Sequence, residues 1–259
     1  NADLKFAGNK TAIDKKEYNK INLAGITGLT NVKYVSPDYP GGIVVQAVNA
    51  SFNPRNVTIN NFSGSYLQST FSGNGSFDNI IGYAMSNEPL KGVINIAVDK
   101  MNLNDWMGTP TESGSTTSSG PFLVPANLDL TLNAKAGSVQ YDKVTYNNIN
   151  GILQLADEKV SLKNIKAEAL EGTLLFNGTY STKANKQNPD ISISYDIQSI
   201  DIQKAFFAYN TIEKIMPIGK FLDGKLNSQL TVSGELNKDM MPDISTLTGK
   251  GNLLLLEGV

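Results

Sequence analysis

Residues 125–136 read PANLDLTLNAKA, and residues 171–180 read EGTLLFNGTY. In both segments apolar residues alternate with polar ones, so one side of an extended backbone is apolar and the other side is polar. The same alternation recurs between the two segments in shorter runs, which are separated by turn-forming residues. Alternating strands joined by tight turns are typical of an antiparallel meander.

Alternating runs of the same kind occupy most of the remaining sequence, and together they give about fifteen candidate strands. We therefore expect a mostly β protein in which long antiparallel meander sheets, curled or sandwich-like, are built from repeated units. One or two short helices are also expected. The clearer helix begins after Asp201, a good N-cap residue, and ends at Pro217, and a single helical turn is expected over residues 104–107.

The apolar sides of these strands must be removed from water, and the alternation is compatible with two ways of doing so. In a closed sandwich, two sheets cover each other and the apolar residues form a core. In a curled trough, the apolar side holds the apolar chains of another molecule. Seven residues are expected to line such a groove, and a closed core would use the same ones: Leu128, Leu130, Leu132, Leu153, Leu155, Leu174 and Phe176.

The two halves of the chain resemble each other. The segment that starts at Val57 aligns without a gap with the segment that starts at Val160, at an offset of 103 positions. The alignment pairs Gly75 with Gly178. Repeats of this kind predict supersecondary units that stack and extend one sheet.

The repeat and the low-complexity sequence GTPTESGSTTSSGP divide the chain into predicted parts. They are a first β repeat unit at 1–107, a flexible Ser/Thr/Gly linker at 108–121, a second β repeat unit ending in a helix at 122–217, and the start of a third β unit at 218–259. The chain starts on NADLKF and stops in the strand-like LLLLEGV, and none of its segments is apolar enough to span a membrane. We therefore expect it to be a fragment of a longer protein.

Composition argues against several classes of function. The chain has no Cys and no His, and its formal net charge is −2. Without a basic surface, nucleic-acid binding is not expected, and without Cys and His the commonest metal ligands and catalytic bases are missing. The sequence therefore predicts no catalytic residues, no cofactor and no metal site, and we expect the protein not to be an enzyme.

Two motifs have simple structural explanations. Asp190, Asp196 and Asp201 lie within DISISYDIQSID without the loop of a calcium site, so a solvated strand face and a helix N-cap are expected. Gly75 and Gly178 occupy equivalent positions of the repeat. Glycine inside a strand favours a β-bulge or the close approach of another group.

An ordered set of motifs over residues 121–257 resembles the C-terminal region of AsmA-family proteins. The upstream motifs are a Pro-Ala-Asn-hydrophobic-Asp strand, a Tyr-x-x-hydrophobic strand, a strand with Asn before Gly, and a strand framed by glycines, at Pro125–Asp129, Tyr141–Val144, Asn148–Gly151 and Gly172–Gly178. The downstream motifs follow a helix that ends in a hydrophobic–Pro pair, and they lie at Gly224, Met241–Asp243 and Leu247–Gly251. Residues 1–107 resemble the family only through the internal repeat.

The resemblance implies a β module of a large protein of the Gram-negative envelope. Family members are anchored in the inner membrane by an N-terminal helix, which would lie outside this chain, and project a β structure into the periplasm. They are similar to TamB-like and bridge-type lipid transfer proteins and are implicated in outer-membrane biogenesis and phospholipid transport through an apolar groove. The resemblance thus implies phospholipid or outer-membrane components as partners and carries over no catalytic residues. The alternative is a secreted or surface β-repeat protein that binds glycan or protein partners.

Overall fold

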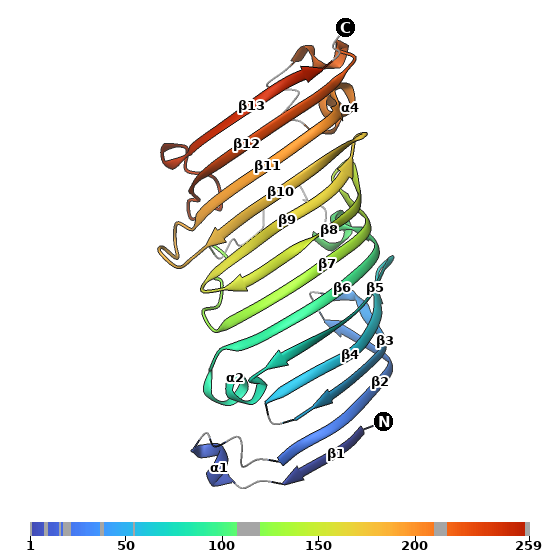
Figure 1. Ribbon diagram of the computed structural model, residues 1–259, viewed down its shortest axis with the longest axis vertical. Coiled ribbons are helices and arrows are strands. Elements are labelled where there is room, and N and C mark those ends of the chain that lie inside the picture. Colours follow the sequence, from blue (N-terminus) through green and yellow to red (C-terminus); the bar gives the residue numbers. More distant parts are fainter. Residues whose placement is uncertain are drawn as a thin grey trace. The chain divides into compact units, whose positions relative to one another are not determined.

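The chain folds mostly into β-strands, as the alternation predicts (Figure 1). The strands lie in the sheet in the same order as in the chain, and the neighbouring pairs with assigned registers are antiparallel. The predicted meander is therefore confirmed. The structure is a computed structural model, and it describes residues 2–7, 10–15, 17, 22–36, 39–53, 55–107, 120–209 and 217–256.

All strands of the described residues belong to one sheet. The two facing sheets of the sandwich alternative are therefore not found among these residues. The strands are β1 (Ala2–Ala7), β2 (Asn22–Ser36), β3 (Tyr39–Phe52), β4 (Asn56–Tyr66), β5 (Ser69–Asp78), β6 (Leu90–Asn102), β7 (Leu128–Tyr141), β8 (Val144–Ala156), β9 (Lys159–Ala169), β10 (Gly172–Ser181), β11 (Asp190–Asp201), β12 (Lys225–Glu235) and β13 (Thr248–Leu256). The helices are α1 (Lys10–Asp14), α2 (Ile80–Ser86), α3 (Leu103–Met107) and α4 (Ile202–Ala208), with 3-10 helices η2 (Pro217–Phe221) and η3 (Ile244–Thr246).

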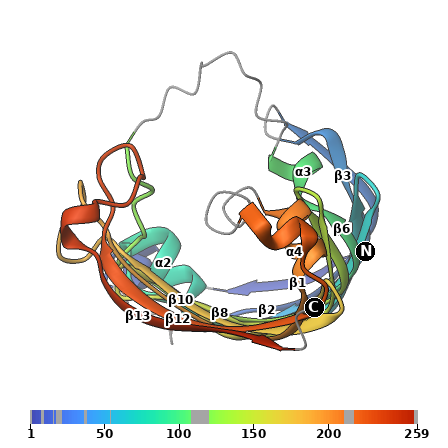
Figure 2. The same ribbon diagram turned by 90° about the horizontal axis from the view of Figure 1, so that it is seen from above.

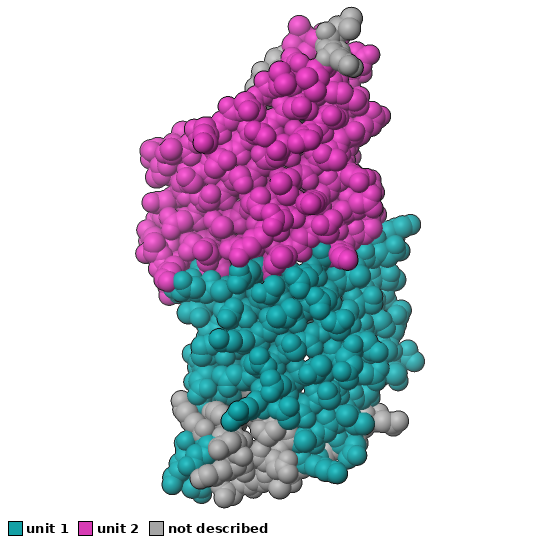
Figure 3. All heavy atoms as spheres, viewed as in Figure 1, with its two compact units in different colours: residues 1–101, 125–134, 154–158 teal, residues 102–124, 135–153, 159–259 magenta. Residues whose placement is uncertain are grey.

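The chain divides into two compact units, which are coloured teal and magenta in Figure 3. The parts predicted from the sequence, with boundaries at 107, 122 and 218, stay a prediction. Unit 1 contains residues 1–101, 125–134 and 154–158, and unit 2 contains residues 102–124, 135–153 and 159–259.

Helices form at both positions where the sequence predicts them. α3 directly follows β6, and α4 directly follows β11. Asp201 caps α4, because its carboxylate accepts a hydrogen bond from the backbone N–H of Lys204 at 2.8 Å. α4 ends at Ala208, because Tyr209 is extended, so the helix stops before the predicted end at Pro217. Residues 210–216 lie outside the described residues, as does most of the predicted linker, residues 108–119.

The internal repeat is visible in two hairpins, one in each unit. β4 and β5 span residues 56–66 and 69–78, and the offset of 103 carries these bounds onto those of β9 and β10. Each hairpin has a register shift at the equivalent position. It follows the pair Ile59–Gly75 in the first hairpin and the pair Leu162–Gly178 in the second. The bulge expected at these glycines is therefore confirmed, and the two copies share register as well as sequence.

Glycines in the first hairpin make room for phenylalanine rings. A Cβ atom on Gly73 would lie 2.6 Å from Cζ of Phe62, and a Cβ atom on Gly64 would lie 2.6 Å from Cζ of Phe71. Both distances are too short for non-bonded carbon atoms. The two ring centroids are 6.4 Å apart, so the glycines allow two large side chains to pack together on one short hairpin.

Asparagine side chains form hydrogen bonds between strands of unit 1. Nδ2 of Asn133 donates to Oδ1 of Asn95 at 2.9 Å, and Nδ2 of Asn95 donates to Oδ1 of Asn74 at 2.8 Å. A second pair joins β3 to β4, where Nδ2 of Asn49 donates to Oδ1 of Asn61 at 2.7 Å. Because an amide carries both donors and an acceptor, one residue type can connect several strands in succession.

Replacing Gly73 with Ala tests the packing of the rings. The new methyl group would collide with the Phe62 ring and with the backbone carbonyl oxygen of Asn95. We expect the free energy of unfolding, measured by urea denaturation, to fall by about 1–3 kcal/mol, as is usual for over-packing. Ser72→Ala, at an exposed neighbouring position, is the control and should change stability by less than about 0.5 kcal/mol. Equal stabilities of the two variants would contradict this explanation.

Candidate functional site

Unit 2 has one apolar and one polar side, and the strand registers show how each side is built. Phe176 of β10 lies opposite Tyr195 of β11, which in turn lies opposite Leu230 of β12. Neighbouring rows repeat this pattern, since residues two apart on a strand point to the same side. Together the rows form the apolar face of unit 2, defined as Leu162, Ile165, Leu174, Phe176, Gly178, Tyr180, Ile191, Ile193, Tyr195, Ile197, Leu230 and Val232.

The opposite side of the same strands is polar. Leu175 lies opposite Asp196, and Asp196 lies opposite Gln229, whose Nε2 donates to Oδ2 of Asp196 at 2.9 Å. Two shallow depressions, each lined by polar and apolar residues together, share Asp196. In the part of the chain that the structure describes, no group of three or more acidic residues is placed to hold a metal ion. The acidic ladder of the sequence thus supplies a strand face and the N-cap at Asp201.

Helix α4 covers one end of the apolar face (Figure 2). Its Ala208 belongs to a buried cluster with Val144 and Ala169, and Leu174 of the apolar face packs against this cluster. Four of the seven residues of α4 are buried. The helix is therefore held against the sheet mainly by burial of its apolar side chains.

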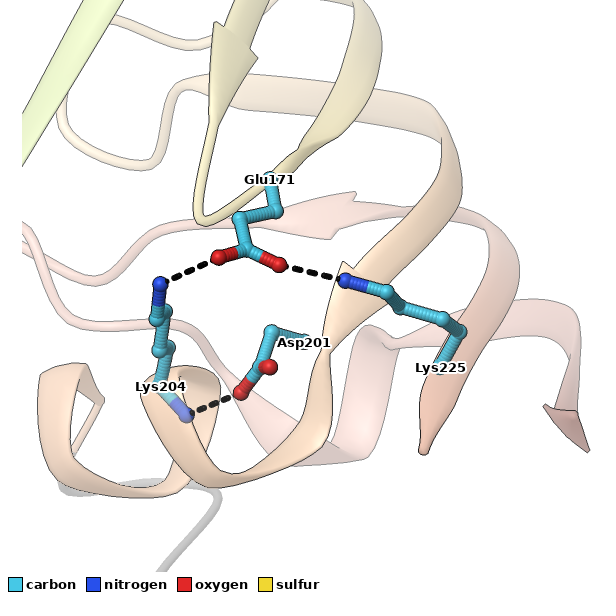
Figure 4. Close-up of polar contacts among 4 residues, drawn as sticks. All are labelled: Glu171, Asp201, Lys204 and Lys225. Carbon is cyan, nitrogen blue, oxygen red and sulfur yellow. Dashed lines mark hydrogen bonds and ion pairs between the residues drawn. The ribbon is translucent and has the colours of Figure 1, made fainter. Parts of the chain in front are cut away.

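Ion pairs and hydrogen bonds also position α4 next to this cluster (Figure 4). Glu171, in the turn between β9 and β10, accepts hydrogen bonds from Nζ of Lys204 on α4 at 2.5 Å and from Nζ of Lys225 on β12 at 2.7 Å. The two ammonium groups lower the pKa of Glu171 from 4.5 to about 2, and the carboxylate raises the pKa of Lys204. The hydroxyl oxygens of Tyr146 and Tyr209 lie 2.8 Å apart. The pKa of Tyr209 is raised mainly because the hydroxyl is buried, and in addition because it forms this hydrogen bond with Tyr146.

Loops cover the opposite end of the apolar face. The backbone N–H of Val124 donates to Oγ1 of Thr182 at 3.2 Å, and both residues are buried. The hydroxyl of Tyr180 donates to the backbone carbonyl of Phe122 at 2.7 Å. Leu236, just after β12, is also buried. Residues far apart in the sequence thus meet where β10 and β12 end.

Between these two covers the apolar face is only half-buried. Phe176, Ile193, Tyr195, Leu230 and Val232 all keep part of their surface accessible. The fully buried apolar side chains of unit 2 are instead found on and around α4 and near the covering loops at the opposite end. A contiguous apolar surface that stays accessible is a common feature of interaction and ligand-binding sites.

The seven residues predicted to line a groove are all half-buried in the structure. Leu174 and Phe176 belong to the apolar face of unit 2, and Leu153 belongs to the same unit. The other four, Leu128, Leu130, Leu132 and Leu155, belong to unit 1. A common groove lined by all seven stays a prediction.

Four residues at the centre of the apolar face are not among the seven that the sequence predicts to line a groove: Ile193, Tyr195, Leu230 and Val232. The signal was present, because β11 reads DISISYDIQSID and β12 contains LTV, both of which alternate. The pairing of these strands with β10 places their apolar residues beside Phe176.

No protein-family model, no curated protein and no solved structure matches this chain. Among the described residues, no helix has both the length and the apolar character needed to cross a bilayer.

Replacing Glu171 with Gln tests the ion pairs that fasten α4. Because the pKa of Glu171 is lowered from 4.5 to about 2 by folding, its contribution to stability is present above about pH 4.5 and is lost as the pH falls toward 2. We expect the melting temperature of the wild type to fall more steeply over this range than that of Glu171→Gln. Asp239→Asn, which removes a carboxylate elsewhere in unit 2, is the control and should keep the wild-type slope. An unchanged slope in Glu171→Gln would count against the ion pairs.

Proposed function

We propose that this chain is a non-enzymatic β module that holds the acyl chains of lipids on the apolar face of unit 2. The observation that carries the proposal is the half-buried middle of that face. Five large side chains from three neighbouring strands stay partly accessible there, between covers at the two ends of the strands. An elongated apolar molecule lying across these strands would remove them from water.

Acyl chains would be held by apolar burial, which is not directional. Each buried CH₂ group contributes about 0.8 kcal/mol, and each Å² of apolar surface removed from water contributes about 25 cal/mol. A chain can therefore be held without a fixed polar contact. This agrees with a face whose polar side-chain atoms are few: the hydroxyls of Tyr180 and Tyr195, and that of Ser228, which lies opposite Ile197 and 3.4 Å from the Tyr195 hydroxyl.

The resemblance to AsmA-family proteins supports the setting that we propose. The module would belong to a protein anchored in the inner membrane and would lie in the periplasm, where it would serve phospholipid transport and outer-membrane biogenesis. The motifs that carry the resemblance lie on or beside β7, β8, β10, β12 and β13 and in the segment between the last two strands. Phospholipid is the partner that both the resemblance and the apolar face favour.

Uptake of a fluorescent acyl probe by the delipidated protein tests the proposal. Phe176→Ser removes a large side chain from the middle of the apolar face, and we expect it to weaken probe binding by about tenfold, since less apolar surface remains to be buried. Leu175→Ser is the matched control, because this residue is half-buried on the polar side of the same strand. It should bind the probe as the wild type does.

Circular dichroism would establish that both variants are folded. Absence of uptake by the wild type, or equal losses in the two variants, would contradict lipid binding on this face. Specific retention of a glycan or protein without probe uptake would instead favour the alternative of a surface β-repeat protein.

A further inference from the structure

Unit 2 exposes a group of large apolar side chains on the loops at the end of the sheet away from α4. They come from the segment before β7 and from the connection between β12 and β13, and their exposed fractions range from 36% to 83%. We call them the rim patch, which consists of Phe122, Leu123, Met240, Met241, Ile244 and Leu247.

Tyr180 brings the two segments of the rim patch together. Its hydroxyl donates to the carbonyl oxygen of Phe122 at 2.7 Å and lies 3.8 Å from Sδ of Met240. The second segment is turned back on itself by Asp243, whose carboxylate accepts a hydrogen bond from the backbone N–H of Ser245 at 3.0 Å. Hydrogen bonds to the loop backbone therefore fix the segments that carry the exposed apolar side chains.

The rim patch continues into the apolar face of unit 2. Tyr180 lies opposite Ile191, and Ile191 lies opposite Gly234, so these three form the last row of the face. Leu247 reaches over this row, because its Cδ2 would lie 2.8 Å from a Cβ atom on Gly234. The rim patch thus adjoins the apolar face, whose last row is covered by Leu247.

The composition of residues 108–119 and the charge of the loops around the rim patch indicate what kind of partner covers it. The residues of 108–119 include no Leu, Ile, Val, Met or Phe, so this part of the chain cannot supply an apolar cover. The loops that carry or flank the patch, residues 120–124, 182–189 and 236–247, contain three lysines and two aspartates. Large apolar side chains on loops with nearly balanced charge suit the interface of a bilayer, where apolar burial supplies the binding energy.

We propose that the rim patch docks unit 2 on the surface of a lipid bilayer. Its side chains enter the boundary between headgroups and acyl chains, and this places the apolar face of unit 2 next to the leaflet from which a lipid would come. The docking itself depends only on the exposed patch, whereas the transfer of a lipid rests on the function proposed above.

Flotation of the full chain with phosphatidylcholine vesicles tests the docking. The double variant Met241→Ser/Ile244→Ser removes two side chains that are 61% and 83% exposed, so the fold should be kept. We expect its partition coefficient onto vesicles to fall at least about tenfold. The matched control is Ile218→Ser/Phe221→Ser on η2, where the side chains are 59% and 73% exposed. It should float as the wild type does.

The outcomes separate docking from lipid binding. Failure of the wild type to float, equal flotation of the two double variants, or loss only in the η2 variant would overturn the docking site. Equilibrium uptake of a water-soluble acyl probe is measured on the same proteins and should be unchanged in Met241→Ser/Ile244→Ser. If the wild type takes up no probe while flotation still depends on Met241 and Ile244, the docking site stands and the proposed lipid binding fails.

Discussion

An alternating strand has an apolar side that water disfavours, and the arrangement of unit 2 depends on how that side is covered. The strands form a single layer, and their covers lie at the two strand ends: α4 at one, loops at the other. Covering an end requires only a short helix or a few loop residues. The middle of the strands has no such cover among the described residues, and its side chains stay half-buried. The accessible apolar surface is thus a direct result of extending one sheet without adding a second.

The covers are fixed by contacts of different kinds. α4 is held by buried Ala208 and neighbouring apolar residues and is positioned by ion pairs to Glu171. The opposite end uses single hydrogen bonds from Tyr180 and Val124 to residues of other segments. Because exposed ion pairs contribute little energy by themselves, Glu171 chiefly fixes where α4 lies. The positions of α4 and of the loops therefore determine how much of the apolar face of unit 2 stays accessible between them.

Much of the fold follows from local patterns in the sequence. The period of two predicts the strands and their apolar sides, the offset of 103 predicts the second bulged hairpin from the first, and Asp201 marks the start of α4. The covers could not be predicted in this way, because they depend on contacts with no local signature. Tyr180 meets Phe122 across 58 positions, and Tyr146 meets Tyr209 across 63. The choice between a sandwich and a single sheet was equally hidden, since both give the same alternation.

Agreement between strand order and chain order has a consequence for how the chain folds. Each hairpin in a meander joins residues close in sequence, so loop-closure entropy is small and pairing does not wait for distant segments. Each new strand can pair with the edge of the sheet already formed as soon as its residues are available. Such a chain can become ordered strand by strand while it is being synthesised. The cost is that every intermediate ends in an unpaired strand edge, which is open to pairing with other chains until the following strand arrives.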